Sequence, residues 1–482
     1  RRQRQMCIRD SLKRVLSNKD YSRDFCYPSA GFHYRLPWYS LPNDRPVDAS
    51  ENYRRIYGGT TIEFYDFYVY ATAAVAVFPY LFFPDNDDPN VKLFASFATF
   101  GLAFLGRPLG SVIFGHFGDR IGRKATLVAS LLTMGIATFI IGLLPTYETI
   151  GLFAPALLAL MRFSQGLGLG GEWSGAALLA TETASKDKRA WAAMWPQLGA
   201  PIGFLVANGS FLILATTLGY TIGDTSGAFM SWGWRIPFLF SSVMVIIGLW
   251  VRFSLEETPV FKKAVESGKR VDAPLAEVFK TSWVQIIQGT LVMVSCYTLF
   301  YLITTWILSY GIGKPEDSAG LGIPYEEFLV LQLISVLMFM GTIPFAALGA
   351  DKRGRRKSLL TSSVAMLIFA ALLPVLLNSE SANKMTVLIF LIVGMGVMGC
   401  IFSPMSAVLP ELFPTNVRYT GSGIAYNLAS ILGAAIAPFI ATWLVTRFSV
   451  DMVGLYLAAT TVISMIAIWV IPETKHKDMI ET

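Results

Sequence analysis

The chain has 482 residues, of which 54% are apolar and only 15% are charged. Soluble globular proteins carry about 25% charged residues, so this composition argues against an ordinary soluble protein. The net charge of +6 would suit a nucleic acid or an acidic surface, but the positions of the basic residues, described below, explain it more simply. The four cysteines show no spacing typical of a disulfide framework or a metal cage.

The N-terminal part of the chain, residues 1–53, is a polar tail that we leave out of the fold prediction. The segment Met6–Ser11 resembles the translated end of a transposase sequencing adapter. We therefore expect part of the sequence before about residue 52 to be non-native read-through, with a genuine cytosolic tail as the alternative. No cleavable signal peptide is evident, so the first apolar segment is expected to stay in the membrane.

Long apolar segments recur through the rest of the chain. A hydrocarbon core of about 30 Å is crossed by a helix of about 20 residues. Backbone groups in lipid must find hydrogen bonds within their own segment, which favours helices. The pattern predicts an all-α membrane protein with twelve transmembrane helices. They are expected at about 56–83, 93–115, 125–144, 152–181, 190–217, 233–254, 284–310, 326–349, 358–378, 385–409, 420–447 and 452–471.

An internal repeat indicates two pseudo-symmetric six-helix bundles. The loop Gly118–Lys124 after the second segment resembles the loop Ala350–Lys357 after the eighth. The last segment of each half is followed by a similar sequence, Glu256–Pro259 in one case and Pro472–Lys475 in the other. The predicted domains are a first bundle over 54–254, a cytoplasmic linker over 255–283, a second bundle over 284–471 and a cytoplasmic tail over 472–482.

The basic residues predict the orientation. Loops on one side of the predicted bundle hold most of the Lys and Arg, including Arg120, Lys124, Arg353 and Arg356. Such loops face the cytoplasm. We therefore expect a multi-pass protein of the inner (plasma) membrane with both termini cytoplasmic. Because topology accounts for the basic charge, no nucleic-acid partner is expected.

The first segment carries ionisable residues at membrane depth. Asp66 lies about ten residues into it, which is about 15 Å at 1.5 Å per residue. Glu63 and Tyr70 lie one turn away on the same helix face. An ionisable group at the centre of a membrane is energetically costly, so its presence there suggests a functional role. We predict that Asp66 and Glu63 bind and release the coupling proton, with a structural ion pair or a buried hydrogen-bond network as the alternative.

The fourth segment adds a cation. Arg162 cannot practically lose its proton, so it is expected to act in proton coupling or substrate binding by pairing with a carboxylate. The alternative is a fixed salt bridge to Asp66 or Glu172. Glu172 lies nearer the inner surface and is a further proton-coupling candidate. None of the three histidines lies within a predicted span, so we expect no histidine proton carrier.

The second half offers polar and aromatic groups in place of buried charge, which suggests that it helps to shape a substrate pocket. The alternative for each aromatic residue is ordinary packing. The candidate substrate-binding residues are Tyr70, Arg162, Gln165, Tyr297, Tyr301, Thr305, Gln332, Tyr426 and Asn427.

Several motifs resemble a known family. The residues Gly118–Lys124 read Gly-Asp-Arg-Ile-Gly-Arg-Lys, which resembles the best-known motif of the major facilitator superfamily. Over about residues 54–475 the chain resembles its metabolite:H+ symporter branch, with departures at Phe64 and Asn416. The other segments that carry the resemblance are Gly59–Phe67, Arg107–Gly110, Arg162–Gly166, Gly170–Trp173, Trp234–Phe238 and Pro410–Gly421.

The repeated loops are candidates for a conformational switch. Asp119 and Asp351 are placed to accept hydrogen bonds from the N-termini of neighbouring helices, where carboxylates are favoured. The resemblance implies that such contacts latch one state of the transporter, and topology determination alone is the alternative. The candidate switch residues are Gly118, Asp119, Arg120, Gly122, Arg123, Lys124, Asp351 and Arg355.

The resemblance and the buried charges together predict a secondary active transporter. We expect proton-coupled symport of a small organic acid or zwitterionic metabolite by alternating access. The alternatives are an exporter or facilitator of sugars or drugs, and a non-transporting nutrient sensor with the same fold. The chain ends soon after Glu473, without the long coiled-coil tail of some osmolyte carriers, which favours an organic acid.

No enzyme activity is expected. The sequence contains no Walker loop, no zinc-type histidine pair and no buried nucleophile with a base. We expect no cofactor and no metal. The expected partners are the substrate, protons and the lipid bilayer, and the expected state is a monomer.

Overall fold

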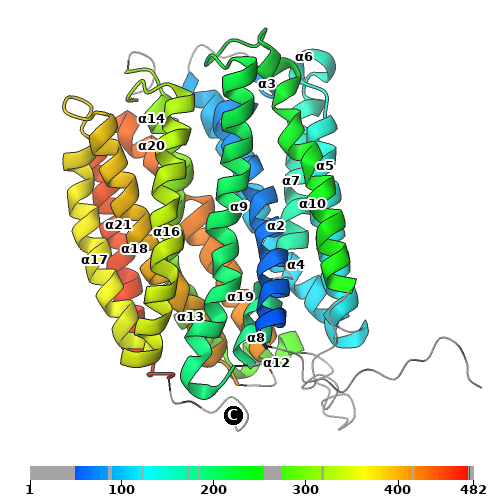
Figure 1. Ribbon diagram of the computed structural model, residues 1–482, viewed down its shortest axis with the longest axis vertical. Helices are drawn as coiled ribbons and strands as arrows, with labels where there is room; N and C mark the ends of the chain where they lie inside the picture. Colours follow the sequence, from blue (N-terminus) through cyan, green and yellow to red (C-terminus); the bar gives the residue numbers. More distant parts are fainter. Residues whose placement is uncertain are drawn as a thin grey trace, which may run out of the picture. The chain divides into compact units, whose positions relative to one another are not determined.

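The structure is a computed structural model that describes residues 49–84, 89–121, 123–170, 173–182, 184–253, 274–315, 320–414, 417–475 and 477. Every element in these ranges is a helix (Figure 1). The predicted tail 1–53 and the linker 255–283 lie mostly outside the described residues, so their boundaries stay predictions.

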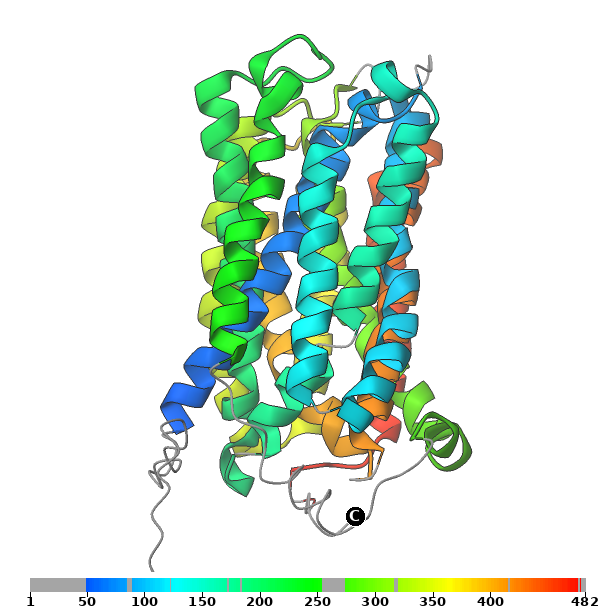
Figure 2. The same cartoon turned by 90° about the vertical axis from the view of Figure 1, so that its right-hand side faces the viewer.

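The first half consists of helices that run alongside one another in both views (Figures 1 and 2). Two short helices, α3 (Phe78–Leu81) and α6 (Tyr147–Ile150), and the short 3-10 helix η1 (Lys186–Lys188) connect them. The π-helix η2 (Phe229–Gly233) leads into the last one. The long helices are α2 (Ala49–Ala76), α4 (Pro89–Ile121), α5 (Arg123–Leu143), α7 (Phe153–Gly170) with α8 (Trp173–Glu182), α9 (Arg189–Leu218) and α10 (Arg235–Phe253).

The second half follows the short helix α12 (Pro274–Thr281). Two of its spans contain a π-helix: η3 (Leu302–Trp306) and η4 (Ile431–Ala435). Its helices are α13 (Trp283–Tyr301) continued by α14 (Ile307–Ile312), α16 (Tyr325–Arg353), α17 (Arg355–Leu377), α18 (Lys384–Leu412), α19 (Arg418–Ser430) continued by α20 (Ala437–Arg447), and α21 (Val450–Val470).

The described helices have the composition of membrane spans. Ten of them are long and apolar enough to cross a bilayer. With α2, which carries Glu63 and Asp66, and with α7 and α8, the arrangement is consistent with the twelve spans predicted. Large apolar side chains such as Trp250 and Phe345, exposed by 74% and 76%, cover the outside. A surface of this kind suits lipid rather than water.

The two halves repeat the same packing. In the first, α2 packs on α9, α4 on α7 and α5 on α10. In the second, α13 packs on α19, α16 on α18 and α17 on α21, which are the corresponding helices. The prediction of two pseudo-symmetric six-helix bundles is confirmed by this correspondence.

Glycines bring α4 and α7 into close contact. A Cβ added at Gly166 would lie 2.1 Å from the carbonyl oxygen of Ala103. One added at Gly170 would lie 2.0 Å from that of Arg107. Small residues permit such close backbone contact between membrane helices. The contact fixes the backbone that carries Arg107 against the helix that carries Arg162.

The halves meet along α4 with α19 and along α9 with α16. Several hydrogen bonds cross between them. Asn427 Nδ2 donates to Ser111 Oγ at 3.2 Å and to the Gly170 carbonyl at 3.3 Å. Gln197 Nε2 donates to the Phe402 carbonyl at 2.9 Å. These bonds close the interface around an internal space.

Candidate functional site

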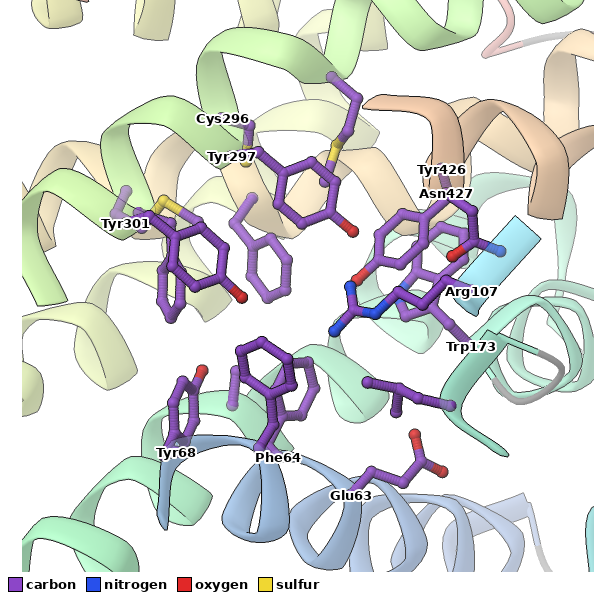
Figure 3. Close-up of a pocket in the computed structure, with 17 residues that line it drawn as sticks. Glu63, Phe64, Tyr68, Arg107, Trp173, Cys296, Tyr297, Tyr301, Tyr426 and Asn427 are labelled. Atoms are coloured by element: carbon purple, nitrogen blue, oxygen red, sulfur yellow. The ribbon is translucent and has the colours of Figure 1, made fainter. Parts of the chain in front are cut away.

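A cavity lies between the two halves and is lined by both (Figure 3). Its volume is about 40 Å³ on the scale where one water molecule needs about 10–15 Å³, so it has room for a few waters. Its charged residues are Glu63 and Arg107, and Asn427 supplies an amide. Nine of its 17 lining residues are aromatic: Phe64, Phe67, Tyr68, Trp173, Tyr297, Phe300, Tyr301, Phe402 and Tyr426.

Arg107, on α4, is the cation of this cavity. Its guanidinium carbon lies 4.8 Å from the ring centroid of Phe67 and 4.7 Å from that of Phe104. The side chain is 5% exposed, and its Nε has no hydrogen-bond partner among the described residues. None of the ion pairs between described residues, defined by a distance of at most 4.0 Å, includes Arg107. Aromatic rings therefore support a buried cation that has no ionic partner in this part of the chain.

Other polar atoms of the lining also lack protein partners. Within the described residues, Tyr68 and Tyr297 have buried hydroxyls with no hydrogen bond, and Trp173 has an unpaired Nε1. Figure 3 shows the Tyr297 hydroxyl directed toward Arg107. Buried polar groups are usually paired, so a cluster of unpaired ones points to a ligand. The cavity can therefore supply several hydrogen-bond donors to a bound ligand.

Glu63, on α2, contributes the carboxylate of the lining. It is 4% exposed and projects toward the cavity from the helix below Arg107 in Figure 3. A carboxylate that shares a small cavity with a bound anion repels it unless a proton is taken up. The position of Glu63 therefore allows proton binding and anion binding to influence each other.

Asp66 lies one turn from Glu63 but behind the cavity lining, inside the first bundle. Thr138 Oγ1 on α5 donates to Asp66 Oδ2 at 3.2 Å. Ser241 on α10 lies near the same carboxylate, although Asp66 Oδ1 has no hydrogen-bond partner among the described residues. The group predicted to carry the proton is thus fully buried and only partly hydrogen-bonded.

A chain of side chains links Asp66 to Arg162. Gln165 Nε2 donates to Thr138 Oγ1 at 2.8 Å and to the backbone carbonyl of Asp66 at 3.2 Å. Arg162 Nη1 in turn donates to Gln165 Oε1. The chain passes through neutral groups, so Asp66 and Arg162 are connected without an ion pair.

Arg162 is held by aromatic rings, as Arg107 is. Its guanidinium carbon lies 3.9 Å from the ring centroid of Tyr70 and 4.4 Å from that of Phe67. Its Nη2 is buried without a hydrogen-bond partner among the described residues. The alternative of a fixed salt bridge to Asp66 is not present, and the Glu172 alternative lies outside the described residues.

Some of the predicted substrate-binding residues line the cavity. Tyr297, Tyr301, Tyr426 and Asn427 line it. The others do not appear in its lining and are buried within one bundle or the other; they are Tyr70, Arg162, Gln165, Thr305 and Gln332. Tyr70 donates to Thr99 Oγ1, and Gln332 Nε2 donates to the Thr304 carbonyl.

Sequence reasoning missed Arg107 as a site residue, along with the aromatic lining of the first half, such as Tyr68 and Trp173. A signal was available for Arg107, because it is a basic residue in the middle of the second predicted span and belongs to a quoted motif. The sequence signal for Trp173 is weaker, because the position of its ring depends on stacking against Tyr426, at a centroid distance of 3.8 Å.

A second group of charges lies at one end of the bundle, where α9, α16, α17 and α18 meet; we call this group the end cluster. Asp351 Oδ1 accepts from the backbone N–H of Ala190 at 3.0 Å, and Oδ2 from that of Trp191 at 2.9 Å. This is the contact predicted for Asp351 with the N-terminus of a neighbouring helix. It joins the second half to the first.

The end cluster continues through buried ion pairs. Arg355 contacts Asp351 Oδ1 at 3.1 Å and Glu411 Oε1 at 3.2 Å. Arg189 of the first half lies 3.9 Å from Glu411. The segment after α21 joins the cluster, because Thr474 Oγ1 donates to Glu411 Oε2 at 2.5 Å and Arg189 Nη1 donates to the Lys477 carbonyl at 2.7 Å.

The corresponding loop of the first half is Gly118–Lys124, and its side chains lie outside the described residues. Gly122 lies outside the described residues, as do the side chains of Asp119, Arg120, Arg123 and Lys124. Gly118 is described only as part of α4. Their predicted switch roles stay predictions.

Comparison with known proteins assigns the family. The model of the major facilitator superfamily matches residues 59–431. Over 423 residues the chain is 53% identical to an inner membrane metabolite transport protein, YhjE, of Escherichia coli K12, covering 87% of this chain and 93% of that protein. It is 37% identical over 420 residues to the shikimate transporter of the same organism, covering 85% and 91%.

The fold is shared with a solved structure at low sequence identity. The proton:xylose symporter XylE, bound to 6-bromo-6-deoxy-D-glucose, superposes with a TM-score of 0.69 at 17% identity. The match covers 89% of this chain and 97% of that one. The helix pairing, the cavity between the halves and the relatives agree, and the chain belongs to the major facilitator superfamily of membrane transporters.

Proposed function

We propose that this transporter carries a small organic acid together with protons, in the same direction, across the inner membrane. The observation that carries the proposal is Arg107, a buried guanidinium without an ionic partner in the described cavity between the halves. An unpaired buried charge costs several kcal/mol. A carboxylate on the substrate would supply the missing partner through charge-assisted hydrogen bonds. A neutral sugar or an apolar drug would leave the charge uncompensated.

Glu63 and Asp66 are proposed to carry the coupling proton. With Glu63 ionised, an anion beside Arg107 faces a negative charge across the same small cavity. Protonation of Glu63 removes that repulsion, so anion and proton favour each other's binding, and the effect is reciprocal. Asp66, buried one turn away, is proposed to bind and release the proton inside the first bundle, where Thr138 donates a hydrogen bond to its carboxylate.

Alternating access is proposed to use the end cluster. Asp351, Glu411 and Arg189 join the two halves at that end, and opening there requires these contacts to break. We place this end in the cytoplasm, with both termini on that side, because the Lys- and Arg-rich loops lie there. The transporting unit is proposed to be a monomer, since the cavity is completed within one chain.

The relatives support the substrate class. One is named a metabolite transport protein and another a shikimate transporter, and shikimate is a carboxylic acid. The solved structure with the same fold is named a proton symporter. These names belong to those proteins and add weight to the proposal for this chain.

The test is uptake into proteoliposomes with an imposed pH gradient, using labelled shikimate and labelled succinate as probes. A gradient of one pH unit supports about tenfold accumulation at one proton per substrate. We expect Asp66→Asn to abolish this accumulation and to leave exchange between labelled and unlabelled substrate. Glu380→Gln, which removes an exposed carboxylate outside the spans, is the matched control.

Two results would contradict the proposal. Accumulation that is indifferent to the pH gradient would remove proton coupling. Normal accumulation by Asp66→Asn would leave coupling in place but show that Asp66 does not carry the proton.

A further inference from the structure

We infer that the substrate acid is a monocarboxylate with a flat, largely apolar ring, bound with its carboxylate at Arg107 and its ring among the aromatic side chains of the cavity. The inference rests on the proposed function of this same cavity and narrows its substrate class.

The charge of the lining limits the substrate to one carboxylate. Arg107 is the one basic residue among the described residues that line the cavity. A second carboxylate would find no cation there and would lie in the same space as Glu63. An ionised group moved into such a site without a partner pays a desolvation cost of several kcal/mol. Dicarboxylates and tricarboxylates are therefore disfavoured.

The Arg107 end of the cavity has the donors that one carboxylate needs. The Nε of Arg107 and the hydroxyl of Tyr297 lie there, and neither has a hydrogen-bond partner within 3.5 Å among the described residues. In Figure 3 the Tyr297 hydroxyl is directed toward Tyr426 and the guanidinium. The Tyr301 hydroxyl is also close to Arg107. A carboxylate between these groups would accept from at least two of them at once.

The chemistry of the rest of the lining suits a ring, and the cavity, which has room for a few waters in this structure, has to widen to admit one. Apart from Glu63, Arg107 and Asn427, the lining consists of aromatic, sulfur-containing and aliphatic side chains. The Asn427 amide already donates to Ser111 and Gly170. Aromatic walls bind flat rings by stacking and edge contacts, which add about 0.5–1.5 kcal/mol to the burial of apolar area. The unpaired hydroxyl of Tyr68 leaves a polar contact for a hydroxyl on the ring.

A zwitterion with a quaternary ammonium group fits less well, although aromatic cages bind such groups. The Phe67 ring already has two guanidinium groups within 4.8 Å of its centroid, those of Arg107 and Arg162. Trp173 and Tyr426 stack face to face with an interplanar angle of 5°, so each covers one face of the other. A further cation near Phe67 would be repelled by the two existing positive charges, whereas a neutral ring would not.

The test is binding measured by isothermal titration calorimetry on the purified full chain, at fixed pH. The probes are benzoate, 4-hydroxybenzoate, cyclohexanecarboxylate, succinate, citrate and glycine betaine. We expect benzoate and 4-hydroxybenzoate, whose rings are flat, to bind at least about tenfold more tightly than succinate, citrate and glycine betaine. This tenfold difference corresponds to about 1.4 kcal/mol, which is less than the expected cost of an unpaired carboxylate. Cyclohexanecarboxylate, whose ring is puckered, is expected to bind more weakly than benzoate.

Two variants and their controls assign the binding to the cavity. Arg107→Gln should weaken ring-acid binding by about 10- to 100-fold, the range for hydrogen bonds to a charged group. Arg447→Gln removes an exposed arginine and should change nothing. Tyr297→Phe should weaken binding about fivefold. Tyr456→Phe removes a buried hydroxyl that also lacks a hydrogen bond but lies on α21, outside the cavity, and should change nothing.

The outcomes separate this inference from the proposed function. Tightest binding of succinate, citrate or glycine betaine, with gradient-driven uptake intact, would overturn the monocarboxylate inference and leave proton symport standing. Ring-acid binding that survives both Arg107→Gln and Tyr297→Phe would overturn the assignment to this cavity. If Arg107→Gln does not fold, Tyr297→Phe alone decides the assignment.

Discussion

Buried charges in the middle of this transporter differ from those at the end cluster. In the middle, the described residues give Arg107 and Arg162 aromatic neighbours but no carboxylate within ion-pair distance. At the end cluster, Arg355 and Glu411 form a direct pair, with Asp351 and Arg189 beside them. Paired charges hold two parts of a protein together, whereas unpaired ones leave binding capacity for something that arrives.

The largest effect on stability is expected from breaking the end cluster. Glu411→Gln removes one of the two carboxylates that pair with Arg355 and also removes the carboxylate near Arg189. Removing one member of a buried ion pair costs about 3–5 kcal/mol. We expect a clear fall in the melting temperature of the purified protein. An unchanged melting temperature would show that the cluster does not hold the halves together.

A smaller effect on stability, of opposite sign, is expected from a substitution in the cavity. Arg107→Met replaces a buried cation by an apolar side chain of similar length. Since the described residues give this cation no ionic partner to lose, we expect stability to rise by about 1 kcal/mol in the absence of substrate. The same melting assay measures it. A fall in melting temperature as large as that of Glu411→Gln would mean that Arg107 is a structural charge, like those of the end cluster.

The smallest effect is expected for an exposed pair. Lys384 and Glu327 form a salt bridge with side-chain exposures of 61% and 47%. Such surface pairs contribute about 0–1 kcal/mol. Lys384→Gln should therefore leave the melting temperature nearly unchanged. A large decrease would imply that this contact, between the N-terminal ends of α16 and α18, contributes to closure at the opposite end of the bundle.

Much of the fold could be predicted from the sequence because its signals are local. Apolar length marked the spans, and the loops Gly118–Lys124 and Ala350–Lys357 marked the repeat. The contact of Asp351 with a helix N-terminus also followed from its place in the repeated loop. These features depend on neighbours in the chain or on a simple rule about lipid.

The composition of the cavity could not be predicted as well, because it depends on which face each helix turns inward. Asp66 and Arg162 have the right depth, yet they face the interior of the first bundle rather than the cavity. Arg107 has a similar depth and faces the cavity, because Gly110 and Gly170 hold α4 close to α7. Depth can be read from the sequence, whereas helix rotation depends on packing between segments.

Thr305 is a second residue whose direction could not be predicted from its spacing in the sequence, and here the structure shows the cause. Spacing by four places Tyr297, Tyr301 and Thr305 on one face of a regular α-helix. The π-helix η3 begins at Leu302, directly after the second of these residues. A π-helix closes its hydrogen bonds one residue further on, so the residues that follow are rotated relative to the α-helical face. Thr305 is accordingly absent from the cavity lining.

The π-helix also separates two tasks along a single span. Below it, Tyr297 and Tyr301 present their rings to the cavity. Beyond it, Tyr310 stacks on Trp306 and donates to the Leu377 carbonyl, which ties the outer segment to α17. Since the inserted residue sets the rotation of one part against the other, substitutions that retune the pocket do not have to disturb the anchoring of the outer segment. The extra residue in the π-helical turn therefore divides this span into two segments that substitutions can change independently.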